Sequence, residues 1–113
     1  MIDLEKMAET HKKLFPKATA KSQFYKMEEE ISEFDDALRK RDGEQAVKEH
    51  ADIIIVCGGL YRWFPQTAQA IYSYYGCDKL IEQEVNRKWE VNLNRKWEWN
   101  GKTYKHVGTD GNE

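Results

Sequence analysis

Apolar residues recur every three or four positions along most of this chain, which is the spacing of one face of an α-helix. The pattern predicts helices at residues 2–15, 19–40, 44–64 and 78–95. Pro65 either only ends the third of these or also starts a short fifth helix at 65–75. Four or five helices of this length favour an all-α bundle with short connections.

The second and third helical segments distribute their apolar residues differently. Residues 53–60 are apolar all round, so we expect the third helix to be the buried centre of the bundle. Gly58 and Gly59 within it would weaken the helix locally and permit either the close approach of another helix or a kink. The second helix, capped by Thr19 or Ser22, has one heptad-like stripe that requires a partner helix: Phe24, Met27, Ile31, Phe34 and Leu38.

The C-terminal part departs from the helical pattern. Residues 97–104 alternate aromatic and polar side chains around Asn100-Gly101, which predicts a short β-hairpin. After Val107 the chain is glycine-rich and polar, so we expect residues 108–113 to form a disordered tail. The expected organisation is a single helical domain at residues 1–107, without a linker.

Composition narrows the class of protein. The chain has 113 residues and a net charge of −2, which fits one domain and argues against a polymeric nucleic acid partner. No apolar run is long enough to span a bilayer, and residues 1–10 do not resemble a signal peptide. Cys57 and Cys77 form no CxxC pair, which suits a protein of the reducing cytoplasm. We interpret Cys57 as a small core residue. The apolar surface is large for so short a chain, so we expect a homodimer or homotetramer.

Two pairs of carboxylates suggest a metal site. Glu30 with Glu33, and Glu49 with Asp52, are each three residues apart, so each pair projects from one helix face with Cβ atoms roughly 5–6 Å apart. A turn at Gly43 would fold the two pairs against each other. Four like charges repel unless a cation lies between them, and carboxylate oxygens suit Mg²⁺, with Mn²⁺ as an alternative. Solvated surface charge is the other interpretation, but a buried run follows Asp52, where an unpaired charge is costly.

The sequence around these pairs resembles a known family. Residues 26–33, followed by residues 49–52, are similar to the EExxE…ExxD signature of the MazG-like all-α nucleoside triphosphate pyrophosphohydrolases, relatives of the dimeric dUTPases. The resemblance extends over residues 22–97. It implies that the four paired acids bind Mg²⁺, and that Glu29 assists as an acid or base beside them. It also implies cleavage between the α- and β-phosphates, giving nucleoside monophosphate and pyrophosphate.

A third element would supply cations for the phosphates. Lys88, Asn92 and Arg95 recur at i, i+4 and i+7, on one face of the helix predicted at 78–95. They resemble the family's late Lys-x-x-x-Asn-x-x-Arg element, in which Lys and Arg meet phosphates and Asn meets the sugar or base. The alternative is that they are ordinary surface residues of a charged helix.

Other candidates are weaker. His50 lies about 100° around the helix from Glu49 and is interpreted as a packing or solvated residue. His11 and His106 belong to no motif of reactive or metal-binding residues in the sequence. Gly58-Gly59 is not followed by Lys-Ser/Thr, so a P-loop enzyme is excluded. The aromatic residues could stack on a base but more often form core or interface contacts: Trp63, Trp89, Trp97, Trp99, Tyr72, Tyr74 and Tyr75.

These features predict a cytoplasmic enzyme that hydrolyses (deoxy)nucleoside triphosphates with Mg²⁺. Two alternatives stay open: a dUTPase-like enzyme that also accepts diphosphates, and a non-catalytic helical module whose acidic faces bind a partner. The expected catalytic residues are Glu29, Glu30, Glu33, Glu49 and Asp52.

Overall fold

A computed structural model describes residues 1–108, and residues 109–113, which make up most of the predicted tail, lie outside the described residues. The described part is mostly helical, with one small antiparallel sheet, which confirms the predicted helical fold with a C-terminal hairpin. Its elements are α1 (Leu4–Leu14), α2 (Ala20–Arg39), α3 (Gly43–Leu60), α4 (Pro65–Tyr75), α5 (Lys79–Leu93), β1 (Lys96–Trp99) and β2 (Tyr104–Val107).

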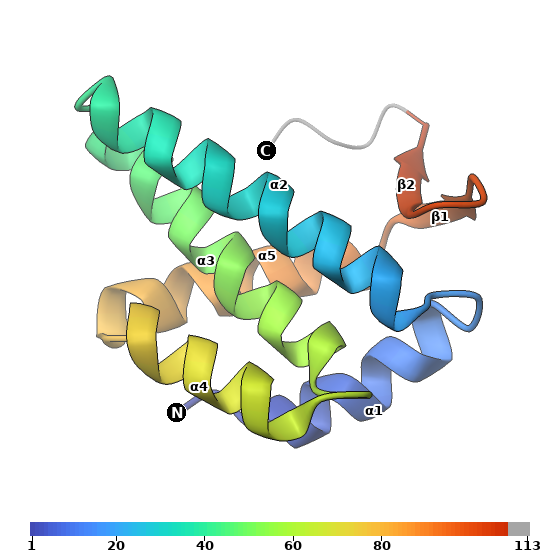
Figure 1. Ribbon diagram of the computed structural model, residues 1–113. Coiled ribbons are helices and arrows are strands. Elements are labelled where there is room, and N and C mark those ends of the chain that lie inside the picture. Colours follow the sequence, from blue (N-terminus) through green and yellow to red (C-terminus); the bar gives the residue numbers. More distant parts are fainter. Residues whose placement is uncertain (109–113) are drawn as a thin grey trace.

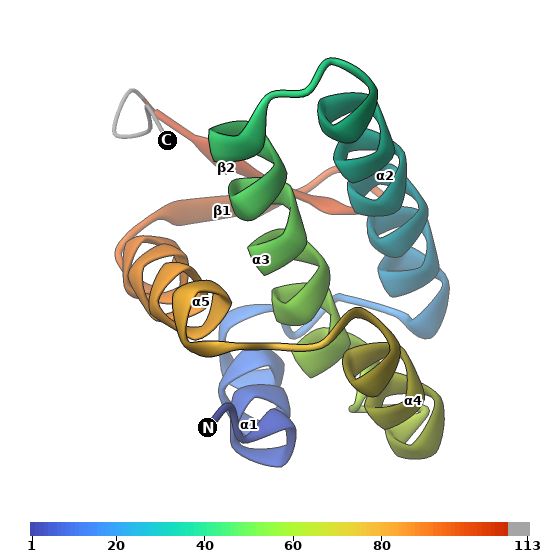
Figure 2. The same cartoon turned by 90° about the vertical axis from the view of Figure 1, so that its left-hand side faces the viewer.

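Helix α3 is the centre of the bundle, as its apolar run predicted. The other four helices all contact it (Figures 1 and 2). Helix α2 lies along α3 and runs in the opposite direction, whereas α1, α4 and α5 pack around the remaining sides. Within residues 1–108, no helix is both long and apolar enough to cross a membrane. The buried side chains of α3 form much of the core: Ile53, Ile54, Val56, Cys57 and Leu60.

Side-chain caps fix where the two acidic helices begin. Thr19 and Ser22 form a reciprocal capping box: Ser22 N donates to Thr19 Oγ1 at 3.0 Å and Thr19 N donates to Ser22 Oγ at 2.9 Å. Asp42 Oδ1 accepts from Gln45 N at 3.0 Å and starts α3. The short turn between α2 and α3 then places their acidic faces next to each other.

Two predicted helix ends are wrong. The helix predicted at 44–64 ends at Leu60, because i→i+3 hydrogen bonds turn the chain before Pro65, and a residue preceding proline is disfavoured in a helix. The helix predicted at 78–95 ends at Leu93, because the chain extends into β1 at Lys96.

The paired glycines allow the close helix approach that the sequence predicted. A Cβ placed on Gly58 would lie 2.9 Å from Met7 Cβ of α1. A Cβ on Gly59 would lie 2.8 Å from His11 Nε2 and would also meet Gln23 Oε1 of α2. Both neighbouring helices therefore pack directly on the backbone of α3 at this level.

The apolar stripe of α2 is only partly covered by α3. Met27 is buried, whereas Phe24 and Leu38 are 43% and 53% exposed. Phe24 stacks on Phe64, itself 43% exposed, with ring centroids 5.6 Å apart. One protomer therefore leaves part of this stripe in contact with solvent.

One strand of the hairpin is hydrogen-bonded to α5 and the other to the connection between α1 and α2. Trp97 Nε1 donates to Asn92 O at 3.0 Å, and Tyr104 Oη accepts from Lys17 N at 2.9 Å. The connecting loop spans residues 100–103, longer than a two-residue Asn-Gly turn, because Asn100 Oδ1 accepts from two backbone N–H groups of the loop. The hairpin is thereby held over the ends of α1, α2 and α5.

A candidate metal and phosphate site

A cleft of about 530 Å³ lies between α2, α3 and α5, with the hairpin lining one end. Helix α2 lines it with Gln23, Lys26, Glu30 and Glu33, which recur at steps of three or four residues and so share one face. At about 1.5 Å rise per residue, this face extends on the order of 15 Å along the helix. The cleft is therefore an elongated groove rather than a round pocket.

The groove brings the two predicted acidic pairs together. Glu30 and Glu33 of α2 and Glu49 and Asp52 of α3 all line it. One carboxylate oxygen from each of Glu30, Glu49 and Asp52 lies within 4.8 Å of the others. Glu33 is adjacent to Glu49 and raises the pKa of that carboxyl. The antiparallel packing of α2 on α3 thus converts two sequence-distant motifs into one acidic cluster.

Burial and mutual repulsion raise the pKa values of these carboxylic acids. Burial, reinforced by the charges of Asp52, Glu33 and Glu49, raises the pKa of Glu30 to about 9. Burial also raises the pKa of Asp52 to about 6, although Lys88 opposes the shift. The pKa of Glu49 is raised, mainly by burial. Without a cation, Glu30 therefore retains its proton at neutral pH.

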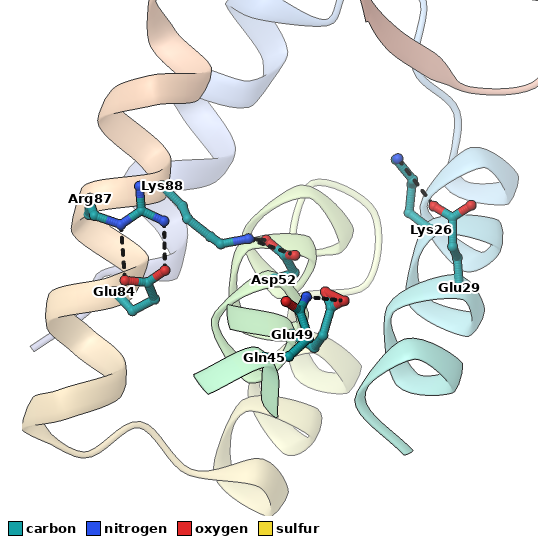
Figure 3. Close-up of polar contacts among 8 residues, drawn as sticks. All are labelled: Lys26, Glu29, Gln45, Glu49, Asp52, Glu84, Arg87 and Lys88. Atoms are coloured by element: carbon teal, nitrogen blue, oxygen red, sulfur yellow. Dashed lines mark hydrogen bonds and ion pairs between the residues drawn. The ribbon is translucent and has the colours of Figure 1, made fainter. Parts of the chain in front are cut away.

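Lys88 reaches from α5 into this cluster. Its Nζ donates to Asp52 Oδ1 at 3.0 Å and to Oδ2 at 2.9 Å, across the space between α5 and α3 (Figure 3). The residue is only 6% exposed, so it is not an ordinary surface lysine. This part of the groove therefore contains both a positive group, the Lys88 ammonium, and negative carboxylates. It can contact an anionic ligand as well as a cation.

The other predicted binding residues lie along the same groove. Asn92 and Arg95 both line it. Arg95, however, follows the end of α5 and is not on a helix face, so the predicted i, i+7 spacing is not what brings it there. Arg95 lies between the end of α5 at Leu93 and the start of β1 at Lys96, so the segment that leads into the hairpin brings it to the groove.

Glu29 and His50 do not line the groove. Glu29 is exposed and pairs with Lys26 at 3.4 Å (Figure 3), although it also belongs to a group of nearby carboxylates with Glu30 and Glu33. His50 packs against aromatic rings and its Nε2 lies 2.8 Å from Gly76 O, which agrees with its interpretation as a packing residue. The assisting role predicted for Glu29 stays a prediction.

Most residues at the hairpin end of the groove carry no recognisable signal in the sequence. Of the predicted aromatic candidates, Trp89 and Trp97 line it. The residues without an earlier assignment there are His11, Phe15, Gln23, Thr103, Tyr104, Lys105 and His106. His11 carried one usable signal, because a histidine in the apolar stripe of the first helix is expected to be buried, and it is.

The chain was compared with protein-family models, curated proteins and solved structures. No family model, curated protein or solved structure matches the chain. The geometry of the groove, and the motif resemblance described above, are thus the basis for a functional proposal.

Proposed function

We propose that this chain hydrolyses (deoxy)nucleoside triphosphates to nucleoside monophosphate and pyrophosphate in a Mg²⁺-dependent reaction. The observation that supports the proposal is the meeting of Glu30, Glu49 and Asp52 within 4.8 Å in a groove of about 530 Å³. Sites for small molecules commonly have volumes of this size. The assignment of the scissile bond rests on the resemblance to the MazG-like family.

The donor set suits a hard divalent cation. Glu30, Glu33, Glu49 and Asp52 offer only carboxylate oxygens, which Mg²⁺ and Mn²⁺ prefer. Burial is the main cause of the raised pKa values of Glu30 and Asp52, and neighbouring carboxylates reinforce it, so a bound divalent cation would favour the ionised form of these groups. When bound, Mg²⁺ would polarise a phosphate oxygen and lower the pKa of a coordinated water.

The protein's own cations would hold the phosphate chain. Lys88 is a buried point charge beside Asp52, and it can turn from that carboxylate to a phosphate oxygen within the same groove. Arg95 lies further along the groove, where its guanidinium can form paired hydrogen bonds with a phosphate. Asn92 lies between them in sequence and can meet the sugar with its amide.

An ionised carboxylate of the cluster would accept the proton of the attacking water. The resemblance assigns an assisting role of this kind to Glu29, which lies within 4.8 Å of the carboxylates of Glu30 and Glu33. General-base help of this kind contributes roughly 10²–10⁴-fold to rate. The conservative replacement Glu29→Gln is expected to reduce turnover less than Glu49→Gln, because Glu49 lines the groove and Glu29 does not.

A substrate panel tests the proposal. The protein is incubated with Mg²⁺ and each nucleoside and deoxynucleoside tri- and diphosphate, and the products are separated by chromatography. We expect triphosphates to give monophosphate and pyrophosphate, and we expect EDTA or Glu49→Gln to abolish this. Cleavage of diphosphates as well would favour a dUTPase-like enzyme. No turnover of any nucleotide by the wild-type protein would refute catalysis and favour a partner-binding module.

A further inference from the structure

Lys88 is a buried cation whose partner is one of the proposed metal ligands. Its Nζ donates to both carboxylate oxygens of Asp52, at 3.0 Å and 2.9 Å, and only 8% of its side chain is exposed. Asp52 also belongs to the group of three carboxylates, with Glu30 and Glu49, that have oxygens within 4.8 Å of one another. The ammonium therefore already holds both oxygens of a carboxylate that a divalent cation would use.

Lys88 has a single partner in the part of the chain that the structure describes. Within residues 1–108, its hydrogen bonds and its ion pair all go to Asp52. Glu84 lies one turn earlier on α5, but both of its oxygens accept from Arg87, at 3.0 Å and 2.7 Å (Figure 3). An ammonium displaced from Asp52 therefore has to find its next anionic partner inside the groove.

A divalent cation and the Lys88 ammonium compete for Asp52. Two cations beside one carboxylate repel each other, and the repulsion is stronger in a partly buried site because water screens it less. If the metal displaces the ammonium, a buried positive charge loses its partner, which is costly. A free divalent cation is therefore expected to bind the acidic cluster weakly when no anion accompanies it.

A phosphate group would remove this conflict. Lys88 and Arg95 line the same groove as the acids, so a phosphate that enters the groove meets positive groups there. Phosphate oxygens accept strong, charge-assisted hydrogen bonds from an ammonium. A phosphate oxygen can thus replace Asp52 as the partner of Lys88, which frees both oxygens of Asp52 for the metal.

We propose that Lys88 is an internal counter-ion that couples metal binding to phosphate binding. It lowers the affinity of the acidic cluster for a free divalent cation, and it leaves Asp52 when a phosphate arrives with the metal. The site therefore takes its ligand as a metal–phosphate complex, and because coupling between two ligands is reciprocal, phosphate has to raise the affinity for the metal. The inference rests on the metal and phosphate binding of the proposed function, but not on its hydrolysis step.

Electron paramagnetic resonance of Mn²⁺ tests the coupling without any turnover. The signal of free aqueous Mn²⁺ gives the dissociation constant of the protein in phosphate-free buffer, and then in orthophosphate added to saturation. The weak binding of Mn²⁺ by orthophosphate itself is measured in a blank without protein and subtracted. We expect orthophosphate to raise the affinity of the wild-type protein for Mn²⁺ at least about fivefold. An affinity that orthophosphate leaves unchanged or lowers would overturn the proposal.

Matched variants separate displacement of Lys88 from general repulsion between charges. Lys88→Met keeps a side chain of similar length, and in phosphate-free buffer it should bind Mn²⁺ at least about tenfold more tightly than the wild-type protein. Lys88→Arg keeps a positive charge beside Asp52 and should stay within about threefold of wild type. Lys26→Met is the control, because Lys26 also lines the groove but pairs with Glu29 at 3.4 Å, and it should change the affinity less than about threefold.

The variants can also overturn the proposal. Lys88→Met that binds Mn²⁺ no more tightly than the wild-type protein, or equal gains from Lys88→Met and Lys26→Met, would do so. Melting curves accompany each variant, and if Lys88→Met does not melt cooperatively, the effect of orthophosphate on the wild-type protein decides alone.

The outcomes distinguish this inference from the proposed hydrolysis. Phosphate-dependent Mn²⁺ binding by a protein that turns over no nucleotide would support the counter-ion and refute the hydrolase. Turnover by a protein whose Mn²⁺ affinity depends on neither phosphate nor Lys88 would refute the counter-ion and leave the hydrolase in place.

Discussion

Replacing Glu30 with glutamine removes one negative charge from the acidic cluster while keeping the size of the side chain. We expect this variant to be more stable than the wild-type protein in metal-free buffer at pH 7.5. The reason is the raised pKa of Glu30, about 9 in the folded protein against 4.5 for an ordinary glutamate. Between these two pH values, the folded protein retains a proton that the unfolded chain releases.

The magnitude follows from this difference in proton binding. The stability of the wild-type protein should be unaffected by Glu30 below about pH 4.5 and should fall as the pH rises from about 4.5 to about 9. Each pH unit costs about 1.4 kcal/mol, so the cost at pH 7.5 is about 4 kcal/mol. Glutamine does not titrate, and this figure is the upper end of the gain expected for Glu30→Gln. In a domain of this size it corresponds to a rise in melting temperature of roughly 15 °C.

The assay is thermal and urea unfolding of both proteins between pH 5 and pH 9, in EDTA and in Mg²⁺. In EDTA, the stability difference should be at most about 1 kcal/mol at pH 5 and should grow with pH. Mg²⁺ at 100 times its dissociation constant should stabilise the wild-type protein by about 2.7 kcal/mol, and Glu30→Gln by less because a ligand is lost. Glu28→Gln is the control, since Glu28 is exposed on the same helix, and it should change stability by less than about 0.5 kcal/mol.

Two results would refute this reasoning. One is a wild-type stability in EDTA that does not decrease between pH 5 and pH 9. The other is a pH dependence of Glu30→Gln that parallels the wild type, since the slope would then arise from other groups.

Three further predictions concern the phosphate cations, the helix packing and the assembly. Lys88→Ala should weaken nucleotide binding and lower turnover at least tenfold while Mg²⁺ binding persists. The control Lys79→Ala, at an exposed position of the same helix, should do neither. Equal effects of the two variants would contradict the role of Lys88 as a phosphate-binding cation. Gly59→Ala should destabilise the protein by about 1–3 kcal/mol in urea unfolding, because the added Cβ would lie 2.8 Å from Nε2 of His11 in α1. The control Gly43→Ala should be close to neutral, because its Cβ would have no atom within 4 Å. Sedimentation should show at least a dimer, because large apolar side chains of α2 and of the segment leading into α4 are exposed; a monomer at micromolar concentration would be the contrary result.

The acidic cluster could be predicted because its geometry is local. An i, i+3 spacing fixes which carboxylates share a helix face, and the short turn at Asp42 and Gly43 leaves α2 and α3 little freedom except to pack side by side. The convergence of Glu30 with Asp52 follows from these two constraints. The buried centre was predictable for a similar reason, since a helix that is apolar all round has to be surrounded.

The hairpin end of the groove could not be predicted, because it depends on contacts between distant segments. Periodicity indicates that Trp97 lies in a strand, but not that this strand lies over Phe15. The same limit applies to Arg95, because the sequence pattern predicts it on a helix face whereas it reaches the groove from beyond the helix end. Tertiary hydrogen bonds, such as that from Lys17 N to Tyr104 Oη, decide this placement and leave no pattern in the sequence.

In the proposed hydrolysis, we expect water to attack the α-phosphorus of the nucleoside triphosphate in the acidic groove, with pyrophosphate as the leaving group. Hydrolysis in ¹⁸O-labelled water with Mg²⁺, followed by mass spectrometry of the products, tests it most directly. We predict one ¹⁸O atom in the nucleoside monophosphate and none in the pyrophosphate, with no label incorporated by Glu49→Gln or in EDTA. Label found in pyrophosphate or orthophosphate instead, or incorporation by Glu49→Gln at the wild-type rate, would contradict the account.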